Sequence, residues 1–211
     1  MESQTIQTIA LMLGAGWASG INLYATMLVL GWMGMNGQAE LPPGLEILSN
    51  PMVMGAAGLM FVVEFFADKV PGLDSLWDAL HTFIRIPAGA LMAAAAAQGL
   101  DMGGAGELLG LILGGGLATT SHVSKASSRA LINTSPEPVT NWTASLSEDA
   151  AVLGGLWTAL NHPWLFVLLL ILFILLAIWL LPKIWRLLKK AGKTVFGWFK
   201  KPPKEPPGKT E

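Results

Sequence analysis

The chain contains no cysteine, only one tyrosine and few charged residues. The absence of cysteine excludes disulfides, thiol catalysis and thiolate metal sites, and it leaves the redox compartment undetermined. Charged residues make up 13% of the 211 residues, whereas 53% are hydrophobic and the mean hydropathy is +0.54. A soluble domain cannot bury so much apolar surface, because one core covers only part of its chain. The sequence therefore predicts an integral membrane protein.

Patterns typical of other protein classes are also missing. Short alternating strands of the β-barrel kind are absent, so the continuous apolar runs favour an all-α, polytopic helical fold. Residues 1–5 lack the basic region of a secretory signal, and the first apolar segment is expected to stay in the mature protein. Zinc-protease, phosphate-loop, dinucleotide and serine-hydrolase motifs do not occur. We therefore expect no enzyme activity, no cofactor, no metal site and no nucleic-acid partner.

Six apolar segments are long enough to cross a bilayer, which takes about 17 residues or more. Proline and glycine residues that favour turns or helix starts separate them. The predicted spans cover residues 6–34, 51–68, 76–98, 105–128, 144–161 and 163–188.

The distribution of lysine and arginine predicts the orientation. Nine of the 13 cationic residues lie between Lys183 and Lys209, which places the C-terminus in the cytoplasm. The loops 35–50 and 99–104 and the turn 161–163 contain none and are expected outside. With six spans, both termini would be cytoplasmic, and the protein would lie in the bacterial inner membrane.

Two apolar stretches 100 residues apart are nearly the same. Residues 11–19 and 111–119 share five identities in nine positions. Gly-interrupted helices at matching positions of two halves indicate an inverted repeat with a binding site near the midplane. The predicted repeats are 6–98 and 105–188, with helix-breaking glycines at Gly14, Gly16, Gly20, Gly114, Gly115 and Gly116. A chance match, or one that serves helix packing alone, is the alternative.

A stripe of ionisable residues follows the second predicted span. Asp74, Asp78, His81 and Arg85 are spaced for one helix face, and Glu64 and Asp68 form an acidic pair before them. A charge inside a bilayer costs at least about 2.5 kcal/mol, so these groups should face protein or a water-filled cavity. In the simpler alternative, Arg85 only neutralises Asp78 or Glu64 and holds two helices together.

Further polar residues occur in other predicted spans. Ser121, His122 and Lys125 share or adjoin one face of the fourth span, while Asn22 and Tyr24 are neutral hydrogen-bonding groups in the first. Arg129 is expected to reach the cytoplasmic interface from a span end. Glu148 and Asp149 are interpreted as first-turn acids that complement a helix dipole.

The C-terminal region differs in composition from the predicted transmembrane domain of residues 1–185. Residues 186–201 combine lysines with aromatic residues, which favours an interfacial segment on anionic lipid. Residues 202–211 are Pro-rich and predicted to be disordered.

The run from Val63 to Arg85, followed by Pro87-Ala88-Gly89-Ala90, resembles an uncharacterised family of bacterial membrane proteins, domain of unknown function 4126. Gly20–Tyr24, Lys125, Arg129 and Asn133 are also similar to that family. The resemblance covers residues 10–160 and implies a membrane protein without implying an activity.

The leading functional hypothesis is a secondary transporter or channel-like permease for a small solute or ion. Its pathway would be lined by Asn22, Tyr24, Glu64, Asp68, Asp74, Asp78, His81, Arg85, Ser121, His122 and Lys125. A membrane scaffold or assembly factor is one alternative, and a protein that handles lipid head groups is another. Assembly into a homo-oligomer stays open.

Overall fold

The computed structural model describes residues 2–70, 72–134 and 138–199, which form helices and no strand. All six predicted apolar segments are confirmed as helices. They are α1 (Glu2–Met35), α2 (Pro51–Ala67), α3 (Leu73–Ala97), α4 (Gly104–Ile132), α5 (Pro138–Asn161) and α6 (Pro163–Phe199), with short 3₁₀ helices η1 (Pro43–Ser49) and η2 (Gln98–Leu100).

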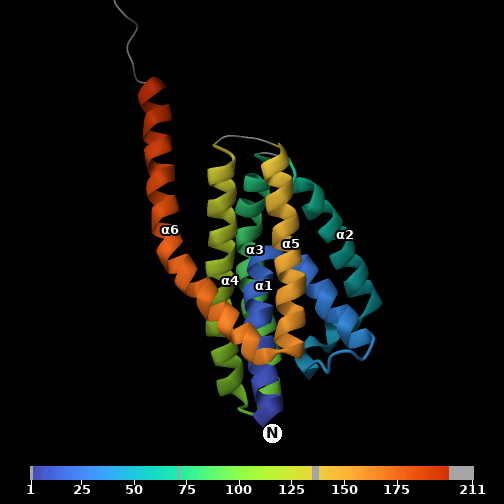
Figure 1. Cartoon of the computed structure of the whole chain (residues 1–211). Helices are drawn as coiled ribbons and strands as arrows, with labels where there is room; N and C mark the ends of the chain where they lie inside the picture. Colours follow the sequence, from blue (N-terminus) through green and yellow to red (C-terminus); the bar gives the residue numbers. More distant parts are fainter. Residues whose placement is uncertain (1, 71, 135–137, 200–211) are drawn as a thin grey trace, which may run out of the picture.

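Helix α1 is broken at Asn22, where the backbone leaves helical geometry (φ −146°, ψ 99°). The side chain of Asn22 stabilises the break, because its Oδ1 accepts a hydrogen bond from the N–H of Ala25 (2.9 Å) and so caps the second half of the helix. After the break the chain returns towards its starting end (Figure 1). Gln38 and Leu41 line one cavity together with Gln7 and Thr8. Within the bundle, α1 is therefore bent back on itself as a helical hairpin.

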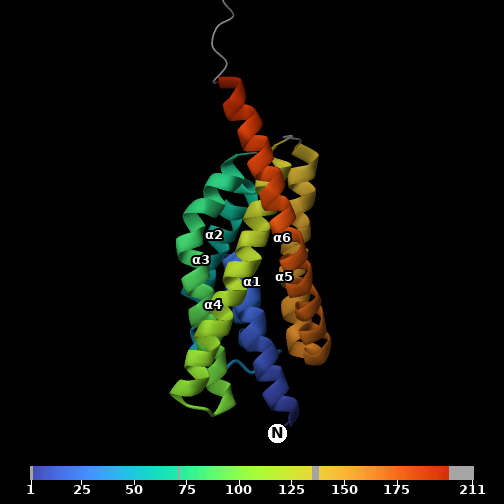
Figure 2. The same ribbon diagram turned by 90° about the vertical axis from the view of Figure 1, so that its left-hand side faces the viewer.

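The remaining helices run along the bundle in alternating directions (Figures 1 and 2). The start of α1 and the end of α6 consequently lie at opposite ends of the molecule. This arrangement gives no support to the prediction that both termini share one side, which assumed that α1 crosses the bundle once. The loops expected outside still lie at the end opposite to the basic end of α6.

The two glycine-rich stretches do meet, but in the same direction. A Cβ atom on Gly16 would lie 2.6 Å from the Cα of Gly114. Further along, the Ser121 hydroxyl donates to the carbonyl of Trp17 (2.7 Å), so the residue numbers rise together in α4 and the first half of α1. An inverted repeat requires these helices to run in opposite directions. The structure therefore does not support the inverted repeat.

The role predicted for the glycines as helix breaks is also wrong. Helix α4 is continuous through Gly114, Gly115 and Gly116, and α1 is helical at Gly14, Gly16 and Gly20. At five of these six positions, all except Gly116, the lack of a side chain serves packing instead, since small residues let helix backbones approach closely. Gly89 of α3, for example, packs against Ala118 of α4 and Ser19 of α1.

The surface is far more apolar than that of a soluble protein, and part of the interior is charged. Large apolar side chains project outward from α2 to α6, including Leu59, Phe83, Ile112, Trp157 and Ile178, while many charged side chains are buried. Three helical segments, Gln4–Met35, Leu73–Leu100 and Pro163–Lys190, are long and apolar enough to span a membrane. The pair η1 and α2, bent by 69°, could form a fourth span. These features are consistent with a membrane protein.

The C-terminal predictions fall partly outside the described residues. Helix α6 continues through the segment predicted to be interfacial as far as Phe199. The ammonium of Lys183 lies over the ring of Trp179, 3.1 Å from its centroid. Residues 202–211 lie outside the part of the chain that the structure describes.

Candidate functional site

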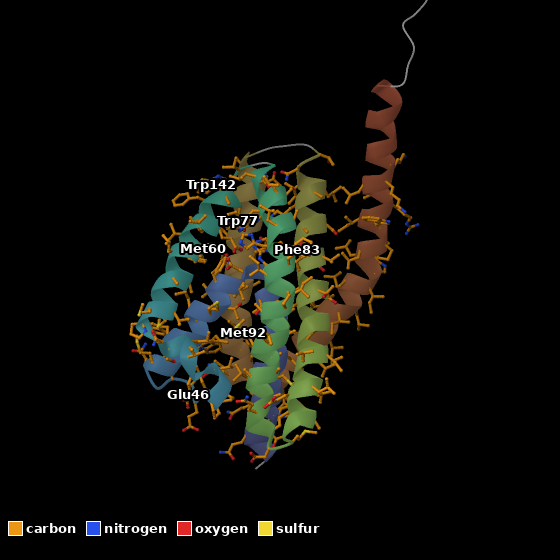
Figure 3. All side chains as sticks on the ribbon, turned by 180° about the vertical axis from the view of Figure 1, so that it is seen from behind. Glu46, Met60, Trp77, Phe83, Met92 and Trp142 are labelled. Atoms are coloured by element: carbon orange, nitrogen blue, oxygen red, sulfur yellow. The ribbon has the colours of Figure 1, made fainter. Side chains whose placement is uncertain are left out.

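Charged and polar side chains fill the end of the bundle that α1 does not reach. Figure 3 shows nitrogen and oxygen atoms gathered between the helices near Trp77. We call this cluster the polar core, and it contains every residue that the sequence assigned to a pathway, together with Arg129, Glu148 and Asp149. The members are Asn22 and Tyr24 of α1, Glu64 of α2, Asp68 after it, Asp74, Asp78, His81 and Arg85 of α3, Ser121, His122, Lys125 and Arg129 of α4, and Glu148 and Asp149 of α5.

Arg85 joins α2 to α3. Its guanidinium donates to Glu64 at 2.7 Å and to Asp78 at 2.8 Å, and all three side chains are almost completely buried. Asp78 and Arg85 lie seven residues apart on one helix, which brings them to the same face. Both carboxylates that the sequence suggested as partners of Arg85 are therefore its partners.

Lys125 lies at the centre of the polar core. Its Nζ is 2.8 Å from Asp68, 3.3 Å from Glu64, 3.5 Å from Glu148 and 3.8 Å from Asp78. The same Nζ donates to the carbonyl of Ile21 at 3.1 Å.

The carbonyl of Ile21 is available to Lys125 because of the break in α1. In a continuous helix the Ile21 carbonyl would accept from the N–H of Ala25. The Ala25 N–H donates to the Asn22 side chain instead. Lys125 therefore links the break in α1 to carboxylates of three other segments.

Arg129 does not extend to the interface as expected, since its side chain is completely buried. It donates to both carboxylate oxygens of Glu148 (2.7 and 3.1 Å) and to the carbonyl of Asp68 (3.0 Å). Because α4 packs on its neighbours up to its last turn, the guanidinium finds carboxylate and carbonyl oxygens within the protein.

Glu148 and Asp149 do not lie in a first helical turn, because α5 already begins at Pro138. Glu148 pairs with Arg129, and Asp149 accepts from the Nδ2 of Asn22 at 3.0 Å. The interpretation as dipole-complementing acids is therefore wrong. A helical stripe of Asn141, Ser145 and Glu148 is the sequence signal that could have identified them.

Asp74 lies at the outer end of the polar core. Its carboxylate accepts from the Nδ2 of Asn133 (2.8 and 3.0 Å) and lies 4.0 Å from Arg129. Asn133 follows α4, so this contact ties the end of α4 to the start of α3.

Two histidines, His81 of α3 and His122 of α4, belong to the polar core. His81 Nδ1 lies 2.9 Å from the carbonyl of Trp77, so Nδ1 carries a proton and the opposite nitrogen, Nε2, can accept from the Tyr24 hydroxyl at 3.1 Å. The Thr82 hydroxyl donates to the carbonyl of Asp78, so it accepts from His122 Nε2 (2.7 Å). His122 Nδ1 then has no partner.

Lys69, in the turn between α2 and α3, was not predicted as a site residue. Its Nζ donates to the carbonyl of Phe65 at 2.9 Å and to the hydroxyl of Ser145 at 3.3 Å. Burial lowers the pKa of the Lys69 ammonium below its usual range. This lysine lies beside the polar core rather than within the carboxylates around Lys125.

Comparison with known proteins identifies the family of the chain. Residues 9–183 match the family described as Domain of unknown function (DUF4126). The chain belongs to the DUF4126 family. No curated protein and no solved structure matches it. The matched range of this DUF4126 chain includes the whole polar core.

Several buried polar atoms of the DUF4126 chain have no hydrogen-bond partner. Three are carboxylate oxygens, Oε2 of Glu64, Oδ1 of Asp68 and Oδ2 of Asp78, and a fourth atom is the Nε of Arg85. Unsatisfied buried polar atoms are rare and point to water or an ion. Among the residues described here, no group of three His, Asp or Glu side chains is arranged to hold a metal ion.

Proposed function

We propose that this DUF4126 protein is a secondary transporter or channel-like permease, and that a small solute or ion passes through the polar core. The observation that carries the proposal is the break in α1 at Asn22. At this break the carbonyl of Ile21 accepts a hydrogen bond from Lys125, within a cluster of buried charges. Discontinuous helices in transporters use such carbonyls and half-helix ends to bind substrates and coupling ions. Irregular backbone at membrane depth is tolerated only inside protein or beside water.

The number of buried charges also supports a role beyond packing. Glu64, Asp78, Arg85 and Arg129 are at most 1% exposed. Well-packed apolar residues of similar volume are often as stabilising as a buried ion pair, so stability alone does not require such groups. Charges within a membrane domain generally mark an ion or substrate path.

The proposed placement follows from the same arrangement. Helices α2 to α6 would cross the bilayer, and α1 would enter and leave on one side. The end that carries Lys69, Lys125 and Arg129 would face the cytoplasm of a bacterial inner membrane, as the positive-inside rule favours. The polar core would then open towards the cytoplasm, and the N-terminus would lie outside.

Thiol labelling tests this proposal directly, because the chain has no cysteine of its own. Ser19 and Ser121 are buried beside the break in α1, whereas Met12 is buried in the apolar half. In membrane vesicles, S19C or S121C should react with a small, charged methanethiosulfonate reagent, and the control M12C should not. If S19C and S121C both stay as unreactive as M12C in fully folded protein, the permease proposal is wrong.

A scaffold remains the second candidate because of one specific observation. Arg85, Lys125 and Arg129 each have at least two carboxylates within 4.0 Å. Such a network can serve as a structural clamp between helices. The scaffold hypothesis predicts inert cysteines in the labelling experiment, together with normal assembly.

A further inference from the structure

We propose that the oxygen atoms around the Lys125 ammonium form a binding site for a monovalent cation, and that Lys125 is its tethered occupant. This inference rests on the proposed permease function and names the substrate class. When Lys125 withdraws, a free monovalent cation would take its place among the same oxygens.

The surroundings of Lys125 resemble an ion-binding shell rather than an ordinary salt bridge. Four carboxylates, from Glu64, Asp68, Asp78 and Glu148, lie within 3.8 Å of one Nζ atom. The carbonyl of Ile21 is a fifth oxygen ligand, at 3.1 Å. A single carboxylate would suffice to pair with a lysine, whereas carboxylate and carbonyl oxygens together are the ligands of hard cations.

A second, independent observation is that three of these carboxylates each keep one unpaired oxygen atom. Glu64, Asp68 and Asp78 are at most 2% exposed, and in each the oxygen atom that does not face Lys125 has no partner. An unpaired buried carboxylate oxygen is costly, so these atoms favour an additional cation or its water.

The charges of the four carboxylates also exceed those of the neighbouring cations. Arg85, Lys125 and Arg129 supply three positive charges against the four negative ones. With Lys125 in place this group carries one net negative charge, and a monovalent cation that replaced the ammonium would restore the same balance.

The geometry favours a monovalent over a divalent ion. The present occupant carries one positive charge, so an alkali or small alkylammonium ion replaces it like for like.

The break in α1 supplies a means of exchange. Because the Ile21 carbonyl belongs to the last turn before Asn22, a movement of the hairpin changes the distance between that ligand and Lys125. Lysine is suited to this role, since its charge is carried on a flexible four-carbon chain.

A cation-dependence experiment on K125A tests the site without any transport assay. The variant and the wild type are purified in lipid nanodiscs, and their melting temperatures are measured in sodium, potassium, methylammonium and choline chloride at equal ionic strength. Choline, too bulky for the shell, is the reference salt. The melting temperature of K125A should rise in at least one of the three small cations, by about 4 °C for each tenfold increase in concentration above its Kd.

The matched control is K69A, which removes a second buried lysine outside the shell. The melting temperature of the wild type should not differ between the four salts, and neither should that of K69A. The double variant D68N/K125A, which removes one shell charge of each sign, should be more stable in choline than K125A. If K125A cannot be recovered in choline, the yield of monodisperse protein in each salt becomes the readout.

The proposal is overturned if K125A and D68N/K125A show no difference between the small cations and choline. It is also overturned if magnesium or calcium chloride, measured in the same way, stabilises K125A and none of the three small monovalent cations does. The permease function is judged separately, by currents from wild-type proteoliposomes on a solid-supported membrane after a sodium, potassium or methylammonium pulse. A cation-dependent K125A combined with an electrically silent wild type would retain the binding site and refute electrogenic transport of these cations.

Discussion

The two ends of the helix bundle are built from the same helices in opposite ways. At the end near the N-terminus, α3 and α4 are held together by small residues, with Gly114 against Ala93 and Gly110 against the backbone of Ala93 and Ala94. At the other end, Arg85 and Lys125 of the same two helices share the carboxylate of Asp78.

The difference follows from the position of the break in α1. Below Asn22, the first half of α1 occupies the interior and packs against glycine and alanine. Beyond Asn22, α1 no longer fills the interior, and charged side chains from α2 to α5 take its place. The break at Asn22 therefore separates a rigid apolar end from a polar end that the proposed function uses.

The largest effect should come from removing Arg85. The R85M variant leaves Glu64 and Asp78 buried without their closest cation, and loss of one partner of a buried pair costs about 3–5 kcal/mol. The melting temperature in detergent or nanodiscs should therefore fall strongly. The triple variant E64Q/D78N/R85M should recover most of the loss, and equal destabilisation of both variants would contradict the importance of charge compensation here.

At the apolar end, G114A should be clearly destabilising. Its added Cβ would meet the Cβ of Ala93 and the carbonyl of Gly89, and overpacking of this kind costs about 1–3 kcal/mol. Gly116, in the same stretch, has no atom within 4 Å of an added Cβ. G116A should therefore melt at or above the wild-type temperature, and a similar loss in both variants would show that close packing is not the cause.

The boundary between the two ends can be tested at Asn22. N22A loses the cap on Ala25 and the hydrogen bond to Asp149. Loss of a helix cap costs about 0.5–2 kcal/mol. Thermal unfolding should reveal this loss in N22A. The control N36A removes an exposed asparagine that bonds only the carbonyl of Trp32, and it should change little.

The smallest effect concerns the pH dependence near Lys69. Burial lowers the pKa of this ammonium from its ordinary 10.5. Between the lowered value and 10.5 the unfolded chain binds the proton more tightly, so stability rises with pH across that window. The melting temperature of the wild type minus that of K69M should increase from neutral pH towards 10.5. A difference that is constant or decreases would contradict the assigned direction.

The sequence predicted most helix positions and most of the polar core. Hydrophobic runs of sufficient length located all six helices, and helical spacing placed Asp74, Asp78, His81 and Arg85 on one face. Charge in an apolar context was enough to identify Glu64, Asp68 and Lys125, because such groups must find partners inside the protein.

The sequence could not predict the path of α1. The predicted span, residues 6–34, is long enough to cross a bilayer as one straight helix. Its length does not reveal that the helix is broken into two shorter halves. The turn depends on tertiary contacts of Asn22, Ile21 and Ala25, which no local pattern reveals. The predictions of an inverted repeat and of a cytoplasmic N-terminus both depended on treating α1 as a single crossing.

Side-specific labelling of both ends of α1 tests the re-entrant hairpin most directly. Gln7 and Gln38 are exposed and line the same cavity, while Thr134 is exposed beyond α4 at the other end of the bundle. In oriented vesicles, an impermeant maleimide should label Q7C and Q38C from one side of the membrane and T134C from the other. Labelling of Q7C and Q38C from opposite sides would show that α1 crosses the bilayer and would contradict this account.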